Sequence, residues 1–146
     1  MTSTVGSEPT LPHGFPFRLV DRIMDGADGR RAVISLTACS PLTHATRQGL
    51  PATLLLEAMA QAALALMATD VSEGDVAGEA GQPGLLVGID QADFSDALIH
   101  DPPGPGVEFY AGCQVRGRFG RMAKVGVWIE REGLEVATAE LLLAAG

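Results

Sequence analysis

One long apolar segment interrupts the alternation of apolar and polar residues along the chain, and it predicts a helix. Pro51 suits the first turn of a helix, and the Ala, Leu and Met residues after it favour helix as far as about Thr69. Because the segment is apolar on every side, we expect other elements to surround it. Its polar exceptions, Glu57 and Gln61, are four residues apart, so they share one face and can form a hydrogen bond.

Shorter segments in which apolar and polar residues alternate flank this helix and predict β-strands. Residues 17–26 and 30–38 precede it, and the Ala-Asp-Gly sequence between them favours a hairpin turn. Strands are also predicted after the helix, at residues 85–95, 107–120, 121–132 and 134–145, the last two joined by a turn at Glu132-Gly133. This order of elements predicts an α+β domain in which one antiparallel sheet buries the helix.

The chain of 146 residues has the length of one domain and the composition of an ordered globular protein, with 47% apolar and 19% charged residues. Residues 1–10 are polar, so we expect a flexible N-terminal tail followed by a single domain over residues 11–146. The segments between the predicted elements lack periodicity or are rich in Gly and Pro, and they are expected to be loops.

Charge and composition disfavour several classes of function. The formal net charge of −8 argues against nucleic acid as the main partner. The polar start lacks the regions of a secretory signal, and Pro51, Glu57 and Gln61 interrupt the segment that most resembles a membrane span. We therefore expect a cytoplasmic protein without a membrane partner. The two cysteines, Cys39 and Cys113, form no metal-binding or redox motif, so no metal site is predicted.

Glu57 is the first candidate for chemistry, because a buried carboxylate is costly unless it is paired, neutralised or used. Its face of the helix is expected to meet something polar, such as a subunit interface, a cavity or a substrate. The alternative is a Glu held by a partner for structural reasons, with Gln61 bound to it or to a facing protomer.

Positive charge gathers late in the chain, where four of the ten Lys and Arg residues are Arg116, Arg118, Arg121 and Lys124. Such a run is usually the exposed edge of a strand pair. Its functional interpretation is a local basic patch that attracts an acidic partner.

Four short motifs follow one another along the chain: Leu-Pro-His at residues 11–13 with Pro-Phe-Arg-Leu-Val-Asp-Arg at 16–22, the helix pattern around Glu57 at 54–63, Gly-Ile-Asp-x-Ala-x-Phe at 88–94, and Ala-Thr-Ala-Glu-Leu at 137–141. In this order and at these separations they resemble the hotdog-fold 3-hydroxyacyl-(acyl carrier protein) dehydratases of fatty-acid, polyene and polyketide synthesis.

The resemblance implies the hotdog fold, in which a curved antiparallel sheet wraps around one long central helix. It also implies a homodimer or dimer-based oligomer, whose protomers pair edge to edge and share two sites at their interface. The implied substrate is a 3-hydroxyacyl thioester on the phosphopantetheine arm of an acyl carrier protein, with no cofactor held by the chain itself. Because carrier proteins are acidic, the basic residues of 116–124 become the expected docking surface.

In a site of this kind, Glu57 would be the acid that protonates the leaving hydroxyl, while a His removes the proton alpha to the thioester. Apolar neighbours are expected to keep Glu57 protonated. Backbone N–H groups at the helix start, near Pro51 and Ala52, would polarise the thioester carbonyl. Gln61 and Met59 are expected to lie near the substrate.

The resemblance breaks down in the loop before the helix. The family's His stands in GHFPGxPVxPG, fourteen residues before the Glu, where this chain has Thr43. His44 lies thirteen residues before Glu57, so one deletion would bring it into register as the candidate base, although Ala-Thr-Arg follows it in place of Phe-Pro-Gly. Ala52 replaces a Gly of the family, and Val107 replaces an Asp.

Three functions therefore remain open. The first is a lyase that removes water from 3-hydroxyacyl thioesters, with Glu57 as acid and His44 as base across a dimer interface. The second is a non-catalytic hotdog subunit that binds acyl chains or pairs with an active partner. The third is a hotdog thioesterase, which uses its helix carboxylate to activate water. His13 is expected to have a structural role, and His100 is expected to face solvent.

Overall fold

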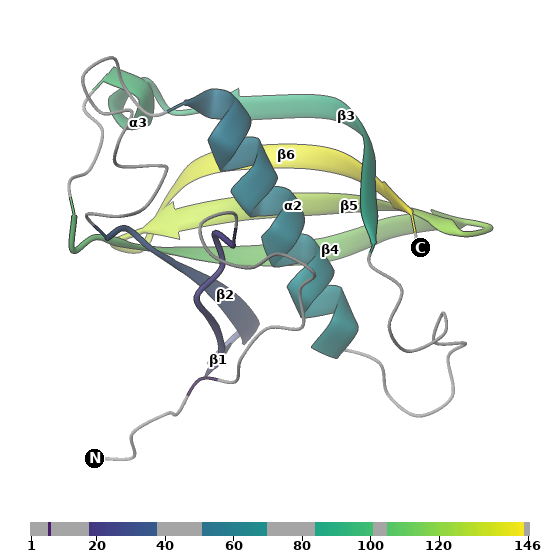
Figure 1. The fold of residues 1–146 in the computed structure, drawn as a ribbon, viewed down its shortest axis with the longest axis horizontal. Coiled ribbons are helices and arrows are strands. Elements are labelled where there is room, and N and C mark those ends of the chain that lie inside the picture. Colours follow the sequence, from purple (N-terminus) through teal and green to yellow (C-terminus); the bar gives the residue numbers. More distant parts are fainter. Residues whose placement is uncertain (1–5, 7–17, 38–50, 70–83, 101–104, 145–146) are drawn as a thin grey trace.

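The computed structural model describes residue 6 and residues 18–37, 51–69, 84–100 and 105–144. Within these residues the chain forms one six-stranded antiparallel sheet that curves around one long helix (Figure 1), which confirms the predicted α+β class. Apart from residue 6, the predicted N-terminal tail lies outside the described residues, and so do most of the predicted loops. In the described part of the chain, no helix is both long and apolar enough to cross a membrane.

Each predicted strand and the long helix are present, with boundaries shifted by a few residues at most places. The short helix α3 was not predicted; Ser95 precedes it and accepts a hydrogen bond at Oγ from the N–H of Leu98 (3.2 Å), which caps its first turn. In chain order the elements are β1 Arg22–Gly26, β2 Gly29–Ser35, α2 Ala52–Thr69, β3 Leu85–Phe94, α3 Asp96–His100, β4 Glu108–Phe119, β5 Met122–Arg131 and β6 Leu134–Ala144.

The strands lie in the order β1-β2-β4-β5-β6-β3, so β3, which follows α2 in the sequence, forms one edge of the sheet and β1 forms the other. α2 crosses the concave side of the sheet and contacts β2, β4, β5 and β6 (Figure 1). The hairpin from β5 to β6 turns at Glu132-Gly133, as predicted. Both residues have the positive φ (52° and 78°) that favours such a tight turn.

The face of the sheet toward α2, which we call the inner face, carries the core. Alternate residues of the central strands, such as Phe109, Val125 and Leu141, are fully buried there. α2 brings small side chains such as Ala58 and Ala62 to this contact, and both are completely buried. The opposite, outer face of the sheet carries most of the polar residues of the strands.

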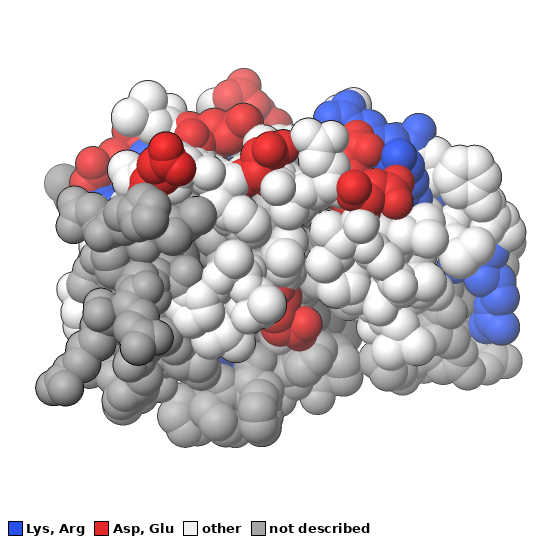
Figure 2. Space-filling model, turned by 90° about the horizontal axis from the view of Figure 1, so that it is seen from above, with Lys and Arg blue, Asp and Glu red and all other residues white. Residues whose placement is uncertain are grey.

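The two edges of the sheet differ in length and in side chains. β1 has five residues, whereas β3 has ten, and Leu85, Val87 and Ile89 of β3 are 60%, 53% and 45% exposed. Two register shifts, at Val87 and Asp90, interrupt the pairing of β3 with β6 and mark β-bulges. Seen from above, uncharged side chains form a broad area between the charged ones (Figure 2).

Candidate active site

The candidate site is built around Glu57, in the first half of α2. Gln61, about one turn further along, donates a hydrogen bond from Nε2 to Oε1 of Glu57 at 3.0 Å, which confirms the contact predicted from their spacing. Gln61 is 1% exposed and is the one buried polar side chain among the described residues, while Glu57 is half-buried. The carboxyl group therefore has a fixed polar neighbour within an otherwise apolar helix.

A second hydrogen bond sets the orientation of Gln61. The backbone N–H of Leu19 donates to Oε1 of Gln61 at 2.8 Å, across 42 residues of sequence. Because this N–H must face the oxygen of the amide, the NH₂ group of Gln61 points the other way, toward Glu57. Oε1 of Glu57 thereby accepts a hydrogen bond, so when this carboxyl group is neutral its proton belongs on Oε2.

The start of α2 offers backbone N–H groups on the same helix as Glu57. The N–H of Leu55 donates to the C=O of Pro51 at 3.1 Å, so the N–H groups of residues 52–54 precede the first intrahelical hydrogen bond. Ala52 is exposed and Pro51 is half-buried, so this end of the helix is accessible at the surface. It lies about 8 Å from Glu57 along the helix axis.

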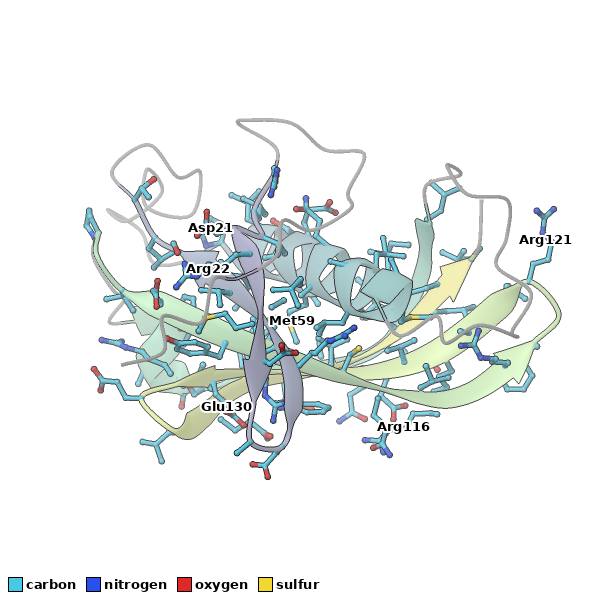
Figure 3. All side chains as sticks on the ribbon, turned by 90° about the horizontal axis from the view of Figure 1, so that it is seen from below. Asp21, Arg22, Met59, Arg116, Arg121 and Glu130 are labelled. Atoms are coloured by element: carbon cyan, nitrogen blue, oxygen red, sulfur yellow. The ribbon has the colours of Figure 1, made fainter. Side chains whose placement is uncertain are left out.

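Met59, which was expected near the substrate, is fully buried with the core cluster between α2 and the sheet (Figure 3). Leu55 and Leu66 of the same helix are buried with it. An acyl chain would reach Met59 only by entering this core, so a contact between Met59 and the substrate stays a prediction.

His44, the predicted base, lies outside the described residues, as do Thr43 and His13. His100 ends α3, but its side chain is also outside what the structure describes. The separation of His44 from Glu57 therefore stays a prediction. Among the described residues, no three or more His, Cys, Asp or Glu side chains come together in a way that could hold a metal ion.

The basic residues predicted to form one patch are divided between the two faces of the sheet. A register shift in the pairing of β4 with β5 inserts Arg116 as an extra residue in β4. Its side chain lies over Gly126 on the outer face, since a Cβ added to this glycine would be 2.8 Å from Nε of Arg116. Arg118 pairs instead with the buried Ala123, which places it on the side of α2. Figure 3 shows the same division, with Arg116 on one side of the sheet and Arg121 projecting from the hairpin tip on the other.

Lys124, the fourth basic residue, forms ion pairs with Asp90 on β3 (2.8 Å) and Glu140 on β6 (3.1 Å). Hydrogen bonds to Asp90 and Glu140 raise the pKa of Lys124 above its ordinary value. An open groove of about 350 Å³ beside this cluster is lined in part by Trp128 and Asp93. These residues belong to the outer face, so the sheet separates the groove from α2.

A second polar network on the outer face joins β1, β2 and β4. Arg22 donates hydrogen bonds to Oδ2 of Asp21 and to Oε1 of Glu108, both at 2.8 Å. The first contact joins two neighbours in the sequence (Figure 3), while the second spans 86 residues and was not predicted. The hydroxyl of Tyr110 donates to Oε2 of Glu108 at 2.9 Å, and Ser35 lies within hydrogen-bond distance of both carboxylates.

The contacts of this network shift the pKa values of its members. The hydrogen bond from Arg22, with a smaller effect from Tyr110, lowers the pKa of Glu108 below its ordinary value. The hydrogen bonds to Glu108 and Asp21 raise the pKa of Arg22, and the hydrogen bond to Glu108 raises the pKa of Tyr110. The ion pair is therefore fully charged at neutral pH.

Residues 6–143 match the ApeP-like family model, which is described as ApeP dehydratase. The chain is 29% identical over 140 residues to the 3-hydroxyacyl-[acyl-carrier-protein] dehydratase FabZ of Listeria welshimeri, with 92% of this chain and 89% of the relative covered. It is 39% identical over 94 residues to FabZ of Salmonella arizonae, where the match covers 61% of this chain and 60% of the relative.

Among solved structures, the chain resembles the dehydratase heterocomplex ApeI:P from Xenorhabdus doucetiae, with a TM-score of 0.71, 18% identity, and coverage of 93% of this chain and 88% of the other. It also resembles protein PH1136 from Pyrococcus horikoshii, with a TM-score of 0.61, 12% identity, and coverage of 97% and 95%. These likenesses concern the fold, and they confirm the predicted hotdog fold.

Proposed function

Because the chain belongs to the ApeP-like dehydratase family, we propose that it converts 3-hydroxyacyl thioesters, carried by an acyl carrier protein, to enoyl thioesters. The FabZ relatives support a hotdog dehydratase of this general kind. The single observation that carries the proposal is the half-buried Glu57 of α2, which has Gln61 as a fixed hydrogen-bond donor.

Glu57 is the general acid of the proposed reaction, and His44 is its base. The base removes a proton from C2 of the acyl chain, and the electron pair of that C–H bond forms the C2=C3 double bond. The C3–O bond breaks at the same time, and Glu57 gives its proton to the departing hydroxyl, which leaves as water. The acid and the base must hold different protonation states at one pH, which different surroundings can provide.

The contacts of Glu57 support this role. Gln61 occupies Oε1, so the proton available for transfer belongs on Oε2, and the carboxyl group keeps one orientation while it reacts. The N–H groups of residues 52–54, at the start of α2, are proposed to bind the thioester oxygen. Negative charge that develops on this oxygen is stabilised by N–H groups at the start of a helix.

Two protomers are proposed to pair through β3. Among the described residues, this edge strand has a hydrogen-bonded neighbour on one side only, and Leu85, Val87 and Ile89 expose apolar surface along it. An edge strand with these properties favours pairing with another strand. A second copy, placed edge to edge, would cover both the backbone and the apolar side chains.

Arg118 and Arg121 are the residues proposed to attract the acidic carrier protein. Arg118 lies on the side of the sheet that carries α2, and Arg121 projects on that side from the hairpin tip (Figure 3). Arg116 and Lys124 lie on the outer face, and Lys124 is already paired with two carboxylates. They are therefore less suited to guide a carrier toward Glu57.

Turnover of a short 3-hydroxyacyl thioester, followed by the absorbance of the enoyl product, tests the proposal. The wild type is expected to be active, and Glu57→Gln and His44→Ala are each expected to lower kcat about a hundredfold or more. The matched control is Glu135→Gln, which neutralises an exposed carboxylate on the outer face and should leave kcat unchanged. Wild-type activity in Glu57→Gln would contradict the proposed acid.

A non-catalytic partner subunit is the second candidate function. It is favoured by the likeness to a solved dehydratase heterocomplex, since the exposed edge of β3 suits a different hotdog chain as well as a second copy. In that case the chain alone has no turnover, and a mixture with an active hotdog dehydratase keeps its full activity when Glu57 is replaced by Gln.

A further inference from the structure

The orientation of Glu57 depends on the backbone that precedes β1. Gln61 faces Glu57 because its Oε1 accepts the N–H of Leu19 (2.8 Å). If this N–H moves, the amide of Gln61 loses a contact that helps to fix its direction. Leu19 and Val20 are 7% and 1% exposed, so the segment that carries this N–H is packed into the core.

Within the part of the chain that the structure describes, this segment makes few backbone hydrogen bonds to the sheet. Residues 18–21 precede the first residue of β1, so they are not part of the ladder that joins β1 to β2. The N–H of Asp21 donates to the C=O of Val33 at 2.8 Å. Arg18 donates to the C=O of Val20 at 3.0 Å and to the C=O of Asp21 at 3.3 Å, so both of these bonds stay within the segment. Side-chain contacts provide further attachment to the sheet.

Arg22 provides that attachment. One nitrogen of its guanidinium binds Asp21 and the other binds Glu108 of β4, so the side chain reaches across β2 to a central strand. Glu108 is held in turn by the hydroxyl of Tyr110, and its lowered pKa keeps it charged at neutral pH. The contacts of Arg22 lie on the outer face, whereas Leu19 contacts Gln61 on the other side of the same short segment.

We propose that Arg22 is a positioning residue for Glu57. By tying residues 18–22 to β4 it holds the N–H of Leu19, and that N–H orients Gln61 and, through it, Glu57. The inference rests on the proposed function of Glu57 as the acid, but it predicts a mechanical link between the two faces of the sheet that can be measured without turnover.

The test compares wild type with Arg22→Met, which removes the guanidinium and keeps an apolar stem. Hydrogen exchange at the N–H of Leu19 is expected to become about tenfold faster, because this group reports directly on its bond to Gln61. The infrared carboxyl band of Glu57, isolated as the difference from Glu57→Gln, is expected to shift and broaden. With a short thioester, kcat is expected to fall about tenfold while KM changes less than about twofold.

Lys124→Met is the matched control. It removes a cation that also binds two carboxylates on the outer face, but these lie on β3 and β6, at the opposite end of the sheet from β1. Exchange at Leu19 and the band of Glu57 should stay as in wild type. Arg22→Lys, which keeps the charge, should bring both readouts back toward wild type.

Unchanged exchange at Leu19 and an unchanged Glu57 band in Arg22→Met would overturn the proposal. If Arg22→Met raises hydrogen exchange throughout the protein, Glu108→Gln becomes the deciding variant. It weakens the contact of Arg22 with β4 and leaves the ion pair of Arg22 with Asp21 in place. Exchange must then rise more at Leu19 than at a core amide such as that of Val127, and equal increases overturn the proposal. Absence of turnover in wild type contradicts the proposed function, but the exchange and infrared results still decide the positioning role.

Discussion

The edge strands β1 and β3 each have one hydrogen-bonded strand neighbour among the described residues, yet the two strands differ in length and in exposed side chains. β1 is five residues long, and the Arg22 network binds its first residue to β4. β3 is ten residues long and exposes Leu85, Val87 and Ile89. Short strands and fixed charges discourage pairing with another chain, whereas a long apolar edge favours it. The difference supports the proposal that a partner chain binds along β3.

The two sides of the molecule also contribute differently to the candidate site. The β1 side supplies the N–H of Leu19, which orients Gln61 and Glu57. The β3 side supplies the surface through which a second chain is proposed to bind. In a site completed by a partner chain, the contact that orients Glu57 would therefore lie on the β1 side of the protomer, and the partner chain would bind on the β3 side.

The largest expected effect comes from a charge placed on β3. Val87→Asp puts a carboxylate on the proposed interface, and we expect dimer affinity to fall by about 2 kcal/mol or more, about thirtyfold. Sedimentation over a range of concentrations measures the change. Met24→Asp, on β1, is the matched control and should leave the oligomer unchanged. If Met24→Asp dissociates the dimer and Val87→Asp does not, β1 is the partner edge and the comparison is reversed.

The buried amide of Gln61, which binds the segment before β1, should matter more for stability than the exposed amide of Gln91 on β3. Gln61→Leu leaves the N–H of Leu19 buried without its acceptor, so the free energy of unfolding should fall by about 1–3 kcal/mol in urea titrations. Gln91→Leu is the control, because Gln91 is exposed and donates to Asp93 at the surface. Its effect should stay within about 0.5 kcal/mol. Equal losses in both variants would contradict the importance given to the contact with Leu19.

The smallest expected effect is the pH dependence of the Arg22 network. The pKa of Glu108 is lowered in the folded protein, so its contribution to stability is present above the ordinary Glu pKa and is lost as the pH falls through the lowered value. Glu108 is about a third exposed, so this contribution should be below about 1 kcal/mol. Glu108→Gln should therefore be less stable than wild type at pH 7, and the difference should shrink in acid. A difference that grows in acid would contradict the lowered pKa.

Local patterns in the sequence were enough to predict most of the elements and one contact of the site. The apolar run gave α2 its boundaries, and the spacing of Glu57 and Gln61 predicted their hydrogen bond because positions four apart meet on any helix. The contact of Gln61 with Leu19 could not be predicted, since it depends on how two segments 42 residues apart pack together. The same holds for Arg22 and Glu108, which are 86 residues apart.

The alternation of side chains between the two faces of a strand is interrupted at one place in β4, for an identifiable reason. Arg116 and Arg118 are two residues apart, which places two side chains on the same face of a regular strand. The register shift between Val115 and Gly117 inserts one extra residue, so the two arginines lie on opposite faces. The sequence shows Gly117 at this place, but it does not show which residue of β5 this glycine pairs with. The short helix α3 was missed because five residues are too few to display helical periodicity.

The position of β3 at the edge has a consequence for biosynthesis. β3 follows α2 in the chain, but in the described part of the sheet its neighbour is β6, which comes after β4 and β5 in the sequence. Strands β4 and β5 lie in the centre of the sheet and contact α2. They also leave the ribosome after α2 and β3. During synthesis, α2 and β3 therefore lack these neighbours until the later strands have emerged. The apolar surface that stays exposed in this period favours binding by chaperones and aggregation.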